Sequence, residues 1–317
     1  MKPKIVVLDG FTTNPGDVSW DSLYELGDVT IYDRTPRELT VERAKDADIL
    51  LSNKTILDKE VISKLPNLKY IGLMSTGTNI VDLTYCRERN IPVTNIPGYS
   101  TDSVAQMVFA FILEFFSGVK AHSDSVHNGM WSDCIDFSYT LFTLQELANK
   151  TIGIIGYGKI GRKVHDIAKA FSMNVLIHSR TKPADVKENE WATFEELLSK
   201  SDIVTLHCPL TEENRYMIDK KALSLMKPTS YLINTARGAL INEEDLAEAL
   251  RNGTIKGAGL DVMVSEPPKK DNPLLKLDNC LITPHIAWAT KEARQRLLSI
   301  LCGNIKAFLN GNPVNLV

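Results

Sequence analysis

The stretch Thr151-Ile152-Gly153-Ile154-Ile155-Gly156-Tyr157-Gly158-Lys159-Ile160-Gly161 decides the fold class of this chain of 317 residues. Its first five residues form an apolar run typical of a buried strand, and the amphipathic sequence RKVHDIAKAF after the glycines indicates a helix. A strand, a G-x-G-x-x-G turn and a helix in this order predict a βα unit of a doubly wound α/β domain.

The glycines of this turn also predict a ligand. Gly156 permits the tight turn, Gly158 lets the backbone approach a pyrophosphate, and Gly161 lets the helix pack against the strand. The N-terminus of the helix then offers unpaired N–H groups to the phosphates. We expect a dinucleotide to contact Gly156, Tyr157, Gly158, Lys159, Ile160 and Gly161. The alternative is a glycine-rich βα turn that binds nothing.

Short apolar runs alternate with amphipathic stretches along almost the whole chain, which predicts two parallel sheets with helices on both faces. The first series of predicted strands comprises Lys4–Leu8, Val29–Tyr32, Ile49–Ser52, Tyr70–Met74 and Val93–Asn95. The second comprises Thr151–Ile155, Asn174–His178, Ile203–His207, Tyr231–Asn234, Gly259–Val262 and Leu281–Thr283. Thr193 with Glu196 forms a capping box, and Asn242 caps a helix that stops at Gly253.

Two segments between the series differ from this alternation. Residues 100–118 are helical and apolar nearly all round, so we expect them to be buried between domains or between subunits. Residues 120–150 are richer in His, Ser, Asp and aromatic side chains and predict an irregular excursion.

The composition argues against several classes of partner. A net charge of −3 gives no electrostatic reason to expect nucleic acid or an anionic membrane. No apolar run is long enough to span a bilayer, and the N-terminus lacks the pattern of a signal peptide. The five cysteines are widely spread without a C-x-x-C pair, which disfavours disulfides and a zinc site and points to a reducing cytosol. We expect a cytoplasmic protein without a metal.

The loop after the second strand of the glycine-turn domain bears on the type of nucleotide. An NAD-specific site usually has a carboxylate here, which accepts from the ribose 2′-hydroxyl. The segment His178-Ser179-Arg180-Thr181-Lys182 has none, and its hydroxyl and cationic groups suit a 2′-phosphate instead. Ser179, Arg180 and Thr181 are therefore candidate cofactor contacts, and NADP(H) is favoured over NAD(H). The alternative is that Arg180 is a solvated loop charge and both cofactors are used.

Three groups suited to catalysis follow strands of the second series: Arg237, Glu266 and His285. Loops after parallel strands share one sheet edge, where ligands bind, so chain order alone places all three on the cofactor's side. When a hydride is delivered to a keto carbon, negative charge grows on the carbonyl oxygen, and an imidazolium can supply the proton. A carboxylate partner favours the charged imidazole, and a guanidinium can grip a substrate carboxylate and polarise the carbonyl. Singly, each has an ordinary structural alternative.

These segments resemble the D-isomer-specific 2-hydroxyacid dehydrogenases over essentially the whole chain. The motifs that carry the likeness are Gly156–Gly161, Asn234-Thr235-Ala236-Arg237-Gly238, Leu260-Asp261-Val262 with Glu266-Pro267, and Thr283-Pro284-His285. The resemblance implies that Arg237, Glu266 and His285 are catalytic and that Asp261 holds the nicotinamide carboxamide. It further implies that Cys208, Pro209 and Thr235 line the cofactor, and that the turn Ser75-Thr76-Gly77 binds the substrate carboxylate through backbone N–H groups. Lys54 could add a second positive charge near the substrate or be a solvated loop lysine.

The resemblance also implies the architecture. Residues 1–100 with 286–317 would form a flavodoxin-like substrate-binding domain, and residues 101–285 a Rossmann dinucleotide-binding domain, with a cleft between them. Family members commonly form homodimers through the cofactor domain. Gln106, Trp131 and their surroundings look like the glycerate dehydrogenase, or hydroxypyruvate reductase, branch, which reduces hydroxypyruvate or glyoxylate to D-glycerate or glycolate.

Two alternative functions stay open at this point. A phosphoglycerate dehydrogenase is less favoured, because the chain stops after its last predicted helix with no room for a regulatory domain. Short versions lacking that domain exist, so length alone does not decide against it. A non-catalytic, nucleotide-sensing binding protein would also keep the fold. A formate dehydrogenase is disfavoured, since that group carries Gln at the position of Glu266.

Overall fold

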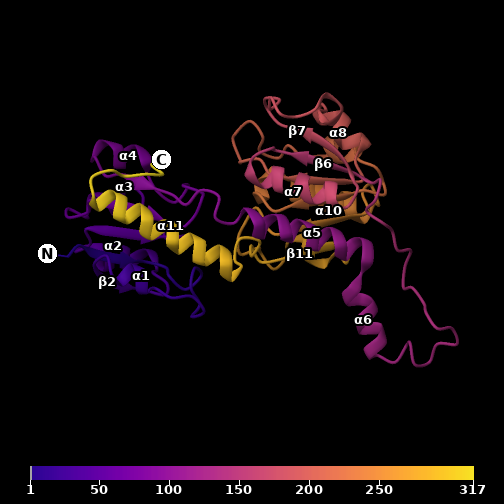
Figure 1. Cartoon of the computed structure of the whole chain (residues 1–317), viewed down its shortest axis with the longest axis horizontal. Coiled ribbons are helices and arrows are strands. Elements are labelled where there is room, and N and C mark those ends of the chain that lie inside the picture. Colours follow the sequence, from indigo (N-terminus) through magenta and orange to yellow (C-terminus); the bar gives the residue numbers. More distant parts are fainter. Residues whose placement is uncertain (1) are drawn as a thin grey trace. The chain divides into compact units, whose positions relative to one another are not determined.

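The computed structural model describes residues 2–317, which divide into two compact units (Figure 1). Unit 1 comprises residues 1–100 and 288–317, of which residues 2–100 and 288–317 are described, and unit 2 comprises residues 101–287. The division differs from the expected one only in assigning residues 286 and 287 to the second unit. Each unit is built on one parallel sheet, so the two Rossmann-like domains predicted from the alternation are present.

Unit 1 contains a five-stranded parallel sheet of order β2-β1-β3-β4-β5. Its strands are β1 (Lys4–Val7), β2 (Asp28–Ile31), β3 (Ile49–Ser52), β4 (Tyr70–Leu73) and β5 (Val93–Thr94). Its helices are α1 (Asp21–Tyr24), α2 (Thr40–Ala44), α3 (Lys59–Ser63), α4 (Leu83–Glu88) and α11 (Lys291–Leu309), with a 3₁₀ turn η1 (Arg37–Leu39). The three central strands are almost wholly buried, as their apolar runs predict.

The core of unit 1 joins the two ends of the chain. Ile5 and Leu51 of the sheet share one buried cluster with Leu297 and Leu301 of α11. The ring of Tyr70 in β4 stacks on Phe308 with centroids 4.6 Å apart. Because α11 covers one face of this sheet, unit 1 requires residues from both termini (Figure 1).

Unit 2 contains a six-stranded parallel sheet of order β11-β10-β9-β8-β6-β7. Its strands are β6 (Thr151–Ile155), β7 (Asn174–His178), β8 (Ile203–Leu206), β9 (Tyr231–Asn234), β10 (Gly257–Leu260) and β11 (Cys280–Ile282). Its helices are α5 (Thr101–Ser117), α6 (Val119–His127), α7 (Lys159–Ala170), α8 (Phe194–Lys200), α9 (Lys220–Leu225) and α10 (Glu243–Arg251). Three 3₁₀ turns complete it: η2 (Glu188–Glu190), η3 (Gly238–Leu240) and η4 (Pro273–Lys276).

The helix boundaries of unit 2 follow the predicted caps. Thr193 and Glu196 form the capping box of α8, and Asn242 accepts from two N–H groups at the start of α10. Gly253, with a φ of +69°, follows the end of α10. The apolar helix α5 packs within unit 2, against α7, β9 and β10; its burial between domains or between subunits stays a prediction.

The segment predicted as an irregular excursion is partly helical, which corrects the sequence prediction. Residues 119–127 form α6, supported by an ion pair between Lys120 and Asp124 one turn apart. Figure 1 shows α6 and the chain after it extending away from the sheet of unit 2. Within the described chain no single helix could cross a membrane; only the bent pair α5 and α6 meets the length and composition required.

Candidate active site

The carboxyl edge of the unit 2 sheet collects most of the predicted site residues. The glycine turn follows β6, and β7 and β8 flank it on either side, so the strand order reverses here. Such a reversal opens a crevice in which dinucleotides bind. Along the edge from β6 come Cys208 after β8, Arg237 after β9, Glu266 after β10 and His285 after β11. The predicted functional groups therefore follow neighbouring strands along one edge of the sheet.

The geometry of the glycine turn agrees with its predicted role. Gly156 has a φ of +95°, and a Cβ there would lie 2.5 Å from the backbone nitrogen of Cys208. A Cβ on Gly161 would lie 2.2 Å from the carbonyl oxygen of Gly156, so this glycine lets α7 approach the turn. No atom lies within 4 Å of a Cβ built on Gly158, which leaves open space beside the backbone. The turn thus has the shape of a cradle for a pyrophosphate.

Helix α7 starts at this turn without a side-chain cap. Its N-cap is Gly158, which has no side chain to accept from the first-turn N–H groups, including those of Lys159 and Ile160. Those donors and the helix dipole favour an anion at this end. The Tyr157 ring lies under the guanidinium of Arg162, 4.5 Å from ring centroid to Cζ.

The loop after β7 places one cation without an ionic partner beside the glycine turn. Lys182 forms an ion pair with Glu188, and the Ser179 hydroxyl donates to the Thr181 carbonyl at 2.8 Å. Arg180 is exposed and forms no ion pair with any of residues 2–317. Of the cations in this loop, Arg180 is the one available to a ligand phosphate.

Buried polar atoms without partners lie farther along the same edge. Within the described residues, the Thr235 hydroxyl and Nε2 of His207 are buried and unpaired. Burial lowers the pKa of His207 to about 3, so its imidazole is neutral near pH 7. Burial also raises the pKa of the Cys208 thiol, and the Asn214 amide holds the Pro209 carbonyl at 2.8 Å. Together with the glycine cradle, the unpaired Thr235 hydroxyl fits a site built for a polar cofactor.

His285 and Glu266 form the central pair of the site. Nδ1 of His285 lies 2.6 Å from Oε2 of Glu266, and the other carboxylate oxygen accepts from the Met263 N–H at 3.1 Å. Both side chains are about one-third exposed, at 28% and 33%. Because Nδ1 faces the carboxylate, Nε2 is the nitrogen left to exchange a proton with a ligand.

Arg237 is held by the loop that follows β9. The buried Asn234 donates to the Arg237 carbonyl at 2.9 Å and accepts from the Ala236 N–H at 3.0 Å. A Cβ on Gly238 would lie 2.0 Å from the Met263 carbonyl carbon, so this loop presses against the base of the Glu266 loop. The exposed guanidinium donates to the Ala236 carbonyl at 2.7 Å. The backbone thus presents an exposed guanidinium at the same sheet edge as the His–Glu pair.

Asp261 has a structural role that the sequence did not reveal. It is 1% exposed, and its carboxylate accepts from the Thr283 hydroxyl and from the N–H groups of Ile286 and Ala287 at 2.6, 2.8 and 2.9 Å. Burial raises its pKa, and the hydrogen bonds act in the opposite direction. The clamp spans His285, which has a φ of +54°, a left-handed conformation that few residues other than glycine adopt. Asp261 therefore fixes the backbone that presents the imidazole.

The predicted substrate-binding residues lie at the carboxyl edge of the unit 1 sheet. Lys54 follows β3, Ser75, Thr76 and Gly77 follow the neighbouring β4, and the Met74 N–H donates to the Ser52 carbonyl at 2.8 Å. The Ser75 hydroxyl donates to the Gly77 carbonyl at 2.7 Å, and the Asn95 amide donates to the Thr76 carbonyl at 2.8 Å. The backbone N–H groups of residues 75–77 have no acceptor among residues 2–317, which suits them to an anion.

The chain is similar to known proteins over its whole length. The family described as "D-isomer specific 2-hydroxyacid dehydrogenase, NAD binding domain" matches residues 109–287. The chain belongs to the D-isomer-specific 2-hydroxyacid dehydrogenase family. It is a dehydrogenase of the type that acts on CH–OH groups with a nicotinamide cofactor.

Individual relatives narrow the comparison. The chain is 46% identical to a hydroxypyruvate reductase of Blautia hydrogenotrophica, with 99% of each chain covered. It is 39% identical to a glycerate dehydrogenase of Methylorubrum extorquens, with 89% of each covered. A solved NADPH-dependent glyoxylate/hydroxypyruvate reductase of Sinorhizobium meliloti, in complex with NADP and malonate, superposes with a TM-score of 0.85 at 25% identity, covering 100% of this chain and 97% of that one.

Sequence reasoning missed the residues that support the site rather than face the ligand. Asn234, Thr283 and Asp9 each hold a loop that carries a predicted site residue. Asn234 and Thr283 stood in the motifs quoted above without a role of their own, and the only signal for Asp9 was a polar side chain just beyond the end of an apolar strand. Among residues 2–317 there is no cluster of three or more His, Cys, Asp or Glu side chains that could hold a metal ion.

Proposed function

We propose that this dehydrogenase reduces hydroxypyruvate or glyoxylate, with NADPH preferred as the hydride donor, to D-glycerate or glycolate. The observation that carries the proposal is the pairing of His285 with Glu266 at the same sheet edge as the glycine cradle. Sequence identity of 46% to a hydroxypyruvate reductase supports the choice of substrate.

The residues of unit 2 have distinct tasks in this reaction. The glycine turn and the N-terminus of α7 hold the pyrophosphate, and Thr235, Cys208, Pro209 and Asp261 line the rest of the cofactor site. When bound, the cofactor supplies the hydride. His285 gives a proton from Nε2 to the carbonyl oxygen, and Glu266 stabilises the imidazolium before that transfer. Arg237 binds the substrate carboxylate and polarises the carbonyl.

The carboxyl edge of the unit 1 sheet carries the other residues to which we assign a substrate-binding role. The free N–H groups of Ser75, Thr76 and Gly77 donate to the substrate carboxylate, and the ammonium of Lys54 supplies a positive charge that attracts it. Residues 1–100 and 288–317 therefore form the substrate-binding domain in this proposal, and residues 101–287 the cofactor-binding domain.

A panel of keto acids tests the function directly. Hydroxypyruvate, glyoxylate, pyruvate and 3-phosphohydroxypyruvate are each supplied with NADPH and with NADH, and the absorbance of the reduced cofactor is followed. We expect the highest kcat/KM with hydroxypyruvate or glyoxylate and NADPH, with turnover of about 1 s⁻¹ or faster. Preference for 3-phosphohydroxypyruvate would assign the chain to phosphoglycerate metabolism instead. No turnover of any keto acid would favour the non-catalytic, nucleotide-sensing protein.

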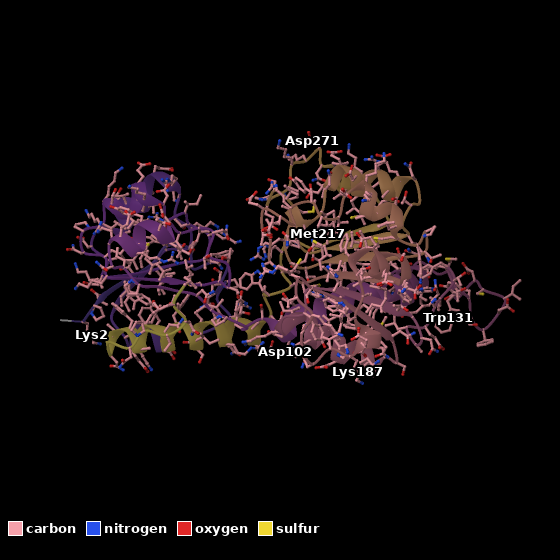
Figure 2. The ribbon with its side chains drawn as sticks, turned by 90° about the horizontal axis from the view of Figure 1, so that it is seen from above. Lys2, Asp102, Trp131, Lys187, Met217 and Asp271 are labelled. Atoms are coloured by element: carbon pink, nitrogen blue, oxygen red, sulfur yellow. The ribbon has the colours of Figure 1, made fainter. Side chains whose placement is uncertain are left out.

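Replacing Arg180 tests the cofactor preference. The variant Arg180→Ala should lose about 10- to 100-fold in kcat/KM with NADPH and change little with NADH, because a charged hydrogen bond to the 2′-phosphate contributes about 1.5–3 kcal/mol. The matched control is Lys187→Ala, which removes an exposed cation from the same segment after β7 (Figure 2). An equal loss with both cofactors would contradict the assignment.

Replacing Glu266 tests its electrostatic role. The variant Glu266→Gln keeps the shape of the side chain but removes the charge that stabilises the protonated imidazole 2.6 Å away. The proton-donating group then lacks its anionic partner, so the decline of kcat/KM for reduction should begin at a lower pH than in the native enzyme. A pH–rate profile of both proteins measures the displacement. Superimposable profiles would remove Glu266 from the mechanism.

The segment that extends from unit 2 suggests a homodimer. Large apolar side chains are exposed on it, among them Met130, Trp131, Ile135 and Phe137, and Trp131 lies near its far end (Figure 2). Exposed apolar surface of this kind is typical of an interface, and we propose that a second copy covers it. Sedimentation should give a dimer, and Ile135→Asp with Phe137→Asp should give a monomer. A monomeric native protein would contradict this.

We propose a cytoplasmic location for the enzyme. All five cysteines are free thiols in the structure, and three of them, Cys86, Cys280 and Cys302, are buried. Burial raises the pKa of Cys86 to about 11 and of Cys280 to about 12, which keeps both as unreactive thiols. Such thiols suit a reducing compartment.

A further inference from the structure

The loop that carries Lys54 is organised around one buried carboxylate. Asp9, two residues beyond β1, is 9% exposed. Its Oδ1 accepts from the Asn53 N–H at 2.8 Å, and its Oδ2 accepts from the N–H groups of Lys54 and Thr55 at 2.6 and 2.7 Å. The Thr55 hydroxyl donates to the same Oδ2 at 3.0 Å. Three successive backbone N–H groups therefore converge on a single anion.

This convergence fixes the direction in which Lys54 leaves the loop. The two preceding residues, Ser52 and Asn53, are buried, and the Asn53 amide donates to the buried Thr13 hydroxyl at 3.2 Å. Lys54, the next residue, is exposed, and its ammonium has no acceptor or ion-pair partner within residues 2–317. Asp9 holds the backbone on both sides of Lys54, so it supports the residue that carries this unpaired cation.

The neighbouring loop offers further donors at the same sheet edge. β3 and β4 pair with Ser52 opposite Leu73, and adjacent strands lie about 4.8 Å apart. The unpaired N–H groups of residues 75–77 follow β4 directly, so they and Lys54 share one sheet edge within unit 1. A cation beside free N–H donors is a binding arrangement for a small carboxylate.

We propose that Asp9 is a positioning residue that holds the 52–55 loop so that Lys54 meets the substrate carboxylate. This inference rests on the proposed function. Asparagine cannot replace Asp9, because in either orientation its NH₂ group faces at least one backbone N–H that needs an acceptor. The chemistry of the site therefore requires an acceptor-only side chain at position 9.

Steady-state kinetics with hydroxypyruvate and NADPH test the inference on the full-length enzyme. Asp9→Asn and Lys54→Met should each raise KM about tenfold or more with little change in kcat, because the contact is equal in ground and transition states. The KM of the double variant should be no higher than that of the single variant with the higher KM, since both substitutions remove the same contact. Asp33→Asn is the matched control: it neutralises an exposed carboxylate just beyond β2 and should leave KM unchanged.

The outcomes separate the inference from the proposed function. If Asp9→Asn lowers the melting temperature but leaves KM unchanged while Lys54→Met raises it, Asp9 is only structural and the inference fails. If Lys54→Met leaves KM unchanged while the native enzyme is active, the inference fails and the function stands. Should Asp9→Asn not fold, Thr55→Val decides: it removes one donor to Asp9 and should raise KM in the same direction, and an unchanged KM overturns the inference.

Discussion

The variant Arg237→Ala should lose on the order of 10³-fold in kcat/KM for keto-acid reduction, equivalent to about 4 kcal/mol of transition-state stabilisation. Both kcat and KM should suffer, because in the proposed mechanism the guanidinium binds the substrate carboxylate and also polarises the carbonyl on which charge develops. The side chain is exposed, and its one hydrogen bond runs to the adjacent Ala236 carbonyl, so truncation leaves no buried group unpaired. The loss should therefore reflect catalysis rather than folding.

Two further measurements make the Arg237 result interpretable. Arg237→Lys keeps the charge but loses the planar fork, and it should recover only part of the activity. Cofactor affinity, measured by quenching of protein fluorescence, should be similar in all three proteins. If Arg237→Ala keeps kcat/KM within tenfold of the native value, Arg237 is not part of the catalytic group.

Replacing the imidazole should have an effect of comparable size. The variant His285→Asn removes the proton donor and should lower kcat by about 10²- to 10⁴-fold. Asparagine is the appropriate replacement, because it tolerates the left-handed backbone at φ +54° that the Asp261 clamp imposes. An alanine would add backbone strain to the loss of the donor.

The pH dependence supplies the internal control for His285. In the His285→Asn background, adding Glu266→Gln should no longer move the pH–rate profile, since the carboxylate acts through the imidazole. A second substitution that still displaces the profile would show that Glu266 reaches the substrate by itself. Retention of native kcat by His285→Asn would contradict the proposed proton donor.

The fold was predictable because each sheet is buried on both faces. Every predicted strand is present, since short apolar runs bounded by turn residues are typical of central parallel strands. The strand with the least accurately predicted bounds was β10, which was predicted at Gly259–Val262 and lies at Gly257–Leu260. Glycines in this strand have a packing reason: a Cβ on Gly259 would lie 2.8 Å from the Phe111 ring of α5. Periodicity alone cannot reveal a neighbour 148 positions away in sequence.

Of the candidate site, only the residues proposed to contact the substrate or the cofactor could be predicted from the sequence. Arg237, Glu266 and His285 follow successive strands, so chain order sufficed to bring them to one edge. The supporting contacts of Asp261 and Asp9 depend on which strands are neighbours. Asp9 reaches the 52–55 loop because β1 lies beside β3 in the sheet, and an alternating pattern of strands and helices does not specify that order.

The return of α11 to the first sheet has a consequence for synthesis on the ribosome. Residues 2–100 emerge before unit 2, but the face of their sheet that Leu297 and Leu301 cover stays exposed to solvent until α11 has been translated. Unit 2, continuous from residue 101 to 287, has all of its own sequence available earlier. Unit 2 should thus be able to fold before unit 1 is complete, and the first 100 residues must survive with an open apolar face in the meantime.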